Sequence, residues 1–137
     1  MTRNDLEQIY YLSRELRLLE RELERLRGRS LIASPLPSTS HASGVSDKVG
    51  DKAARIVDLE RRIEQRKKLV AEVYDFIDNI KDAQMRIIVK SHCVYQDSWN
   101  ETLDKVGGEA TSDGIKKRYL RFLKKTFQNC PECPECP

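Results

Sequence analysis

The chain has 137 residues, of which 34% are charged, 39% are hydrophobic and 7% are aromatic, and its mean hydropathy is −0.64. This length suits one domain, or one small domain with an extension, and the composition excludes a thick hydrophobic core. The formal net charge of +3 is too small to indicate a partner by itself, so the distribution of charge along the chain matters more.

Residues typical of helices dominate the sequence. Leu, Glu, Lys and Arg recur at helical spacing, and β-branched residues seldom alternate with polar ones. This pattern argues against a sheet protein and predicts an all-α protein. No secretory signal or transmembrane run is visible, and the four cysteines do not form a spaced disulfide framework. These features predict a cytoplasmic protein without a membrane partner.

The first predicted helix carries a heptad pattern. Its apolar residues recur in steps of 3, 4, 3, 4 and 3, which is the alternation of a coiled coil. Asn4 is a suitable N-cap for this helix and Gly28 is a suitable stop. The apolar positions are Ile9, Leu12, Leu16, Leu19, Leu23 and Leu26.

The segment 29–50 contains Pro35, Pro37 and many serines, and it is predicted to be a flexible connector. A second heptad run follows, and Arg66 alone interrupts it. Arg66 either fixes the register of the paired helices or extends its side chain to the edge of the seam. Neither helix can bury its stripe alone, so residues 1–80 are predicted to form an antiparallel hairpin or a homodimeric coiled coil. The second stripe is Ile56, Leu59, Ile63, Arg66, Val70, Val73, Ile77 and Ile80.

Three compact helices are predicted after the long pair, in a domain of residues 81–128. Asp82 is a suitable cap for the first of them, and Ser98 is a suitable cap for the short second helix. Thr111 or Ser112 caps the third.

The last predicted helix is basic. The segment from Ile115 to Lys125 holds six bases and no acid, and Gly107 is placed to adopt a positive φ in the turn before it. A solvated helix face is the ordinary explanation of such bases. The glycine turn, the missing acids and the suitable preceding helices favour a helix-turn-helix whose last helix enters the major groove of double-stranded DNA. The predicted DNA-binding residues are Ser112, Lys116, Lys117, Arg118, Arg121 and Lys124.

The stretch DAQMRIIVKSHCVYQDSWNETLDKVGG, followed by IKKRYLRFL, resembles the helix-turn-helix of sigma-factor region four. More closely, the chain is similar to a family of small phage and prophage proteins that carry this domain at the C-terminus. DLEQIYYLSRELRLLERELERLR, SPLPS and VDLERRIEQRKKLV resemble the N-terminal parts of that family, so the resemblance extends to about Leu123. It implies DNA binding and transcriptional control in a bacterial host, with the host RNA polymerase as a further partner.

The chain departs from that family pattern in two helices. Ser91, His92 and Cys93 stand where Leu-Arg-Tyr is usual, and Leu103 stands where a small alanine is usual. The packing is expected to differ at these positions, because Ser91 removes a core contact and Leu103 adds bulk at a tight helix crossing. Loss of the arginine at His92 is expected to remove one contact with the DNA backbone. Trp99 is predicted to be a core anchor rather than a base-stacking residue.

The tail 129–137 is rich in cysteine and proline. Cys130, Cys133 and Cys136 have the spacing of half a zinc site, but a structural zinc site needs four ligands, so a disordered tail is the favoured interpretation. No cofactor is expected.

No catalytic arrangement is visible, because the chain has only two histidines and its double glycine lacks the residues of a phosphate-binding loop. The chain is therefore predicted not to be an enzyme. The alternative to a phage-type DNA-binding transcriptional regulator is a helical coiled-coil module for protein interaction or scaffolding, without DNA binding.

Overall fold

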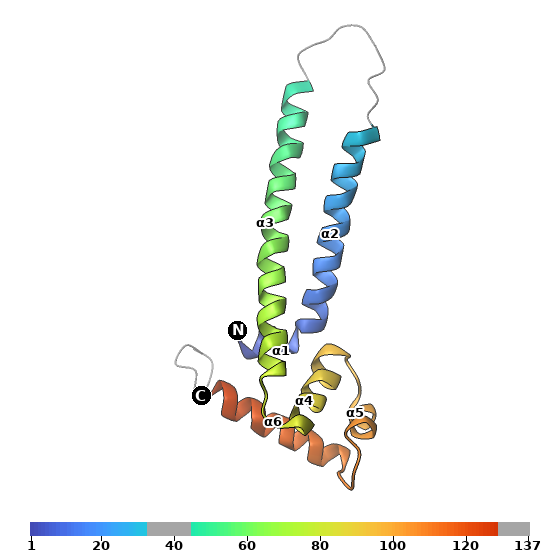
Figure 1. Ribbon diagram of the computed structural model, residues 1–137, viewed down its shortest axis with the longest axis vertical. Coiled ribbons are helices and arrows are strands. Elements are labelled where there is room, and N and C mark those ends of the chain that lie inside the picture. Colours follow the sequence, from blue (N-terminus) through green and yellow to red (C-terminus); the bar gives the residue numbers. More distant parts are fainter. Residues whose placement is uncertain (33–44, 129–137) are drawn as a thin grey trace. The chain divides into compact units, whose positions relative to one another are not determined.

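The computed structural model describes residues 1–32 and 45–128, and every regular element in these ranges is a helix (Figure 1). The predicted all-α class is confirmed. Within the same ranges, no helix has both the length and the apolar character needed to cross a membrane. In chain order the elements are α1 (Arg3–Glu7), α2 (Ile9–Ile32), α3 (Val45–Asp78), α4 (Ala83–Val89), the π-helical turn η1 (Lys90–Val94), α5 (Trp99–Val106) and α6 (Ser112–Phe127).

The chain divides into two compact units, which are described here one at a time. The hairpin unit is Ser13–Lys68, and the C-terminal unit combines Met1–Leu12 with the described residues from Leu69 onward. The last turns of α3 thus belong to the C-terminal unit, although the predicted boundary at residue 80 assigned them to the hairpin.

In the hairpin unit, α2 and α3 run side by side in opposite directions, and their heptad stripes pack against each other (Figure 1). Leucine and isoleucine side chains from both helices close the seam, as the heptad pattern predicts. The buried residues are Leu23, Leu59 and Ile63, and Leu16, Leu19, Leu26 and Ile56 pack against them partly buried.

Ion pairs across the seam define the antiparallel register of the hairpin. Glu15 pairs with Arg66, with 3.0 Å between Oε2 and Nε, whereas Glu22, further along α2, lies 3.9 Å from Arg55 of α3. Arg66 therefore extends to the edge of the seam, as one of the two sequence interpretations proposed. These side chains are 41–68% exposed, so each pair contributes at most about 1 kcal/mol to stability.

The ends of the long helices differ from the sequence prediction. Thr2, not Asn4, caps the first turn, and the backbone breaks at Gln8 before α2 begins. Gly28 does not end α2, which continues to Ile32. A glycine inside a helix costs only about 1 kcal/mol relative to alanine, and contacts with α3 by the neighbouring Leu26 offset this cost.

The core of the C-terminal unit draws on every helix of that unit. It includes the C-terminal part of the second predicted stripe. Residues of one heptad run therefore pack in two separate cores. The buried residues are Leu6, Ile9, Val73, Ile77, Ile80, Met85, Ile88, Val89, Cys93, Ile115, Tyr119, Leu123 and Phe127.

Candidate nucleic-acid interface

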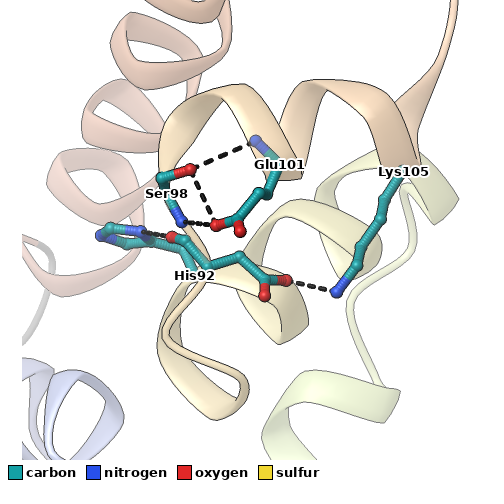
Figure 2. Close-up of polar contacts among 5 residues, drawn as sticks. His92, Ser98, Glu101 and Lys105 are labelled. Atoms are coloured by element: carbon teal, nitrogen blue, oxygen red, sulfur yellow. Dashed lines mark hydrogen bonds and ion pairs between the residues drawn. The ribbon is translucent and has the colours of Figure 1, made fainter.

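A reciprocal capping box begins α5. The Ser98 hydroxyl accepts the Glu101 backbone N–H at 3.3 Å, and the Glu101 carboxylate accepts the Ser98 backbone N–H at 2.7 Å (Figure 2). The backbone hydrogen bond from Ser98 is the main reason that the pKa of Glu101 lies below its ordinary value. The cap predicted at Ser98 is confirmed, and it determines where α5 starts.

A second polar contact fixes the chain just before α5. His92 Nδ1 lies 3.4 Å from the backbone carbonyl oxygen of Asp97, and the Asp97 carboxylate pairs with Lys105 on the last turn of α5 (Figure 2). The last turn of α5 is therefore attached to the segment that precedes this helix.

Two glycines form the turn between α5 and α6. Gly107 has φ 70° and ψ −179°, and Gly108 has φ 86°, so both have conformations that residues with a Cβ rarely adopt. The Thr111 hydroxyl then accepts the Gly114 N–H at 3.1 Å and begins α6. The predicted end of α5 and the predicted cap of α6 are both confirmed, with Thr111 rather than Ser112 as the capping residue.

One face of α6 is buried in the core. Ile115, Tyr119 and Leu123 are each at most 3% exposed, and Phe127 extends the same stripe by one turn. Phe122 is half-buried and packs against this core. α6 also packs against both α4 and α5.

The opposite face of α6 carries exposed bases. Lys117, Arg121 and Lys124 follow one another at i, i+4 and i+7, which places them on a single stripe of an α-helix. Lys116 and Lys125 flank the stripe on either side and are also exposed. Within residues 1–32 and 45–128, none of these five bases forms an ion pair with a carboxylate. We refer to these five residues as the basic face.

Arg118 differs from the basic face because its guanidinium is held by α4. Nη2 donates to the Asp82 carboxylate and Nη1 donates to Gln84 Oε1, both at 2.7 Å. Ser112 also differs, because it is half-buried in the first turn of α6. Sequence reasoning had placed both residues among the DNA contacts. It missed the partner of Arg118 because no local pattern links residues 36 positions apart.

Two residues of the π-helical turn lie in the core of the unit. Ser91 and Cys93 are both 2% exposed, and Cys93 Sγ lies 3.2 Å from Tyr119 Oη. Burial is the main reason that the pKa values of the Cys93 thiol and the Tyr119 hydroxyl are raised. Leu103 is half-buried against the same core, so the unit accommodates the larger side chain.

His92 and Trp99 form a stacked ring pair, with 4.0 Å between centroids and 23° between planes. Trp99 packs against the core, as predicted, and its ring is also 5.5 Å from that of Tyr119. His92 is thus held by its neighbours in the fold.

No three His, Cys, Asp or Glu side chains of the described residues gather closely enough to hold a metal ion. The predicted half-site of Cys130, Cys133 and Cys136 lies outside the described residues. No family model, curated protein or solved structure matches the chain.

Proposed function

We propose that the chain binds double-stranded DNA and acts as a phage-type transcriptional regulator in the cytoplasm of a bacterial host, without catalysing a reaction. In this proposal α5, the glycine turn and α6 form a helix-turn-helix, and α6 enters the major groove. The observation that carries the proposal is the basic face, on which five exposed cations lack carboxylate partners among the described residues.

The physical argument rests on the availability of these cations. A cation that already pairs with a carboxylate must break that pair to reach a phosphate, whereas the side chains of the basic face need only release solvent. Exposed lysines and arginines on a helix can contact phosphates or the acceptor atoms of guanine in the major groove. Arg118 supports the interface indirectly, because it holds α6 against α4.

Fluorescence anisotropy of the full chain on a labelled DNA duplex, repeated over a series of salt concentrations, tests the proposal. The affinity should fall steeply with salt, since each neutralised phosphate releases condensed counterions. Substitution of Lys117, Arg121 and Lys124 together by alanine should reduce the slope of log K against log salt by roughly 2 to 3.

A matched control removes the same charge from the hairpin unit. Arg17, Arg21 and Lys68 are exposed bases outside the basic face, and their joint substitution by alanine should leave most of the salt slope intact. Equal effects of the two triple variants would mean that only net charge matters, and the proposed interface would be wrong. Absence of binding by the folded chain would reject DNA binding altogether.

The outer face of α2 favours a second candidate function, in which the hairpin binds a protein. Leu18 is 62% exposed, whereas Leu16, Leu19, Leu23 and Leu26 of the same helix pack in the core of the hairpin unit. Arg21 and Arg25 lie one and two turns further along the same face. Arginine around an exposed apolar side chain is typical of protein interfaces. The proposed partner is the host RNA polymerase, and a second copy of the chain is a further possibility that sedimentation equilibrium tests.

Biolayer interferometry with purified bacterial RNA polymerase tests this second candidate. Leu18→Glu should weaken binding to the polymerase while the affinity for DNA stays unchanged. Val57 is similarly exposed on α3, so Val57→Glu serves as the control for an added surface charge. Equal affinity of the polymerase for both variants and the unmodified chain would exclude a role for this face.

A further inference from the structure

A pocket of about 400 Å³ lies beside the basic face, within the C-terminal unit. Its wall is built by four segments of that unit, namely α1, the π-helical turn with the residues after it, α5 and α6. A volume of this order is typical of sites that hold small molecules. The lining residues that matter here are Glu7, His92, Gln96, Trp99, Lys116 and Tyr119.

Three packed rings form the aromatic side of the pocket. His92 stacks on Trp99 at 4.0 Å, and the Tyr119 ring lies 5.3 Å from His92 and 5.5 Å from Trp99. Three rings in mutual contact hold one another in place, so a planar ligand meets a surface that is already organised. Preorganisation of this kind reduces the entropy that is lost when a ligand binds.

Two charged side chains line the pocket, Glu7 and Lys116. The Glu7 carboxylate is occupied by Arg3, with 2.9 Å between Oε1 and Nε. Lys116 is exposed and forms no ion pair with a carboxylate in the described part of the chain. Its ammonium group is therefore the charge at the pocket that is available to a ligand, and an anionic group would pair with it.

The backbone around the pocket is irregular. His92 and Cys93 lie on the π-helical turn, and Gln96 has φ 57°, the one positive φ of a non-glycine residue in the described ranges. Single π-turns and strained residues concentrate at sites that hold ligands. The Gln96 side chain also donates to the Cys93 carbonyl at 3.1 Å, which ties these two irregular segments together.

We propose that this pocket binds a small planar aromatic anion of about mononucleotide size, with its ring against the aromatic cluster and its anionic group on Lys116. Lys116 belongs to both the pocket and the basic face, so a bound anion neutralises one of the cations offered to DNA. The ligand then lowers the affinity for DNA, and DNA lowers the affinity for the ligand by the same factor. This regulatory part rests on the proposed DNA binding, whereas binding of the ligand does not.

Adenosine monophosphate is a suitable probe, because Trp99 is the only tryptophan of the chain and reports directly on the pocket. Titration of the full chain without DNA should change the tryptophan fluorescence saturably. Adenosine, which lacks the phosphate, should bind at least about tenfold more weakly, since a hydrogen bond to a charged group contributes roughly 1.5 to 3 kcal/mol. Inorganic phosphate at the same ionic strength should leave the fluorescence unchanged.

Two neighbouring lysines provide the matched variants. Lys116→Gln should weaken binding of adenosine monophosphate about tenfold, whereas Lys117→Gln, which does not line the pocket, should leave it unchanged. Absence of a saturable signal, equal binding of adenosine, or equal effects of the two variants would overturn the proposal. Circular dichroism should show that both variants retain their helices.

The regulatory part is tested by repeating the DNA titration at a saturating concentration of adenosine monophosphate. The affinity for DNA should fall for the unmodified chain and for Lys117→Gln, but not for Lys116→Gln. If the chain binds the nucleotide but no DNA, the proposed function fails and the pocket stands. If both ligands bind without affecting each other, the regulatory part is wrong.

Discussion

Arg118 of α6 and Asp82 at the start of α4 form an ion pair, with 2.7 Å between Nη2 and Oδ2. The other carboxylate oxygen of Asp82 accepts the Gln84 backbone N–H at 3.0 Å. A single carboxylate thus caps one helix and attaches the last helix to it. This contact gives Arg118 a positioning role, in contrast to the solvated cations of the basic face.

The two functions of Asp82 can be separated by substitution. Asp82→Ala should lower the free energy of unfolding by about 1 kcal/mol or more through loss of the cap. Arg118→Ala should cost less than about 1 kcal/mol, because the paired side chains are 48% and 47% exposed. Asp82→Asn keeps a capping oxygen and should resemble Arg118→Ala. Urea denaturation measures all three, and an asparagine variant as unstable as the alanine variant would contradict the assignment of the cap.

The hydroxyl of Thr102 is the one buried side-chain polar atom of the described residues without a hydrogen-bond partner. Thr102 is fully buried in α5. Thr102→Val replaces this hydroxyl with a methyl group of similar shape and should stabilise the chain by about 1 kcal/mol in chemical denaturation. Thr102→Ser, which keeps the hydroxyl and removes the methyl group, should instead destabilise it. A loss of stability on Thr102→Val would show that the hydroxyl is satisfied in solution.

The same substitution at two glycines should have opposite effects. Gly107 combines a positive φ with an extended ψ, so Gly107→Ala should cost about 1 to 3 kcal/mol. Gly28 lies inside α2, and no atom lies within 4 Å of a Cβ built on it. Gly28→Ala should therefore raise stability by up to about 1 kcal/mol. Thermal melting monitored by circular dichroism compares the two variants. Equal shifts of their melting temperatures would contradict the geometry of the turn.

The capping box of α5 should make stability depend on pH. Hydrogen bonds from Ser98 hold the pKa of Glu101 below its ordinary value of 4.5. A depressed pKa means that the stabilisation is fully present above the ordinary value and is lost as the pH falls through the depressed one. Glu101→Gln should therefore melt below the unmodified chain at neutral pH, and the difference should vanish in acid. A constant difference across this range would rule out the carboxylate as its source.

Local patterns predicted much of this molecule. The heptad stripes, the caps at Asp82 and Ser98 and the end of α5 at Gly107 all depend on residues close together in the sequence, where helix chemistry acts directly. Gly28 shows the limit of such reasoning. A glycine stops a helix only if the chain turns there, and α2 continues through Gly28 to Ile32.

The sequence by itself determined the all-α class and the gathering of cations on one stripe of α6, because helical periodicity assigns each residue to a face. Only the tertiary structure decided which of these cations are engaged. Arg118 pairs with Asp82, Lys116 borders the pocket beside Trp99, and the remaining bases face solvent. Contacts between residues distant in the chain depend on how the helices pack, and no spacing along the sequence encodes them.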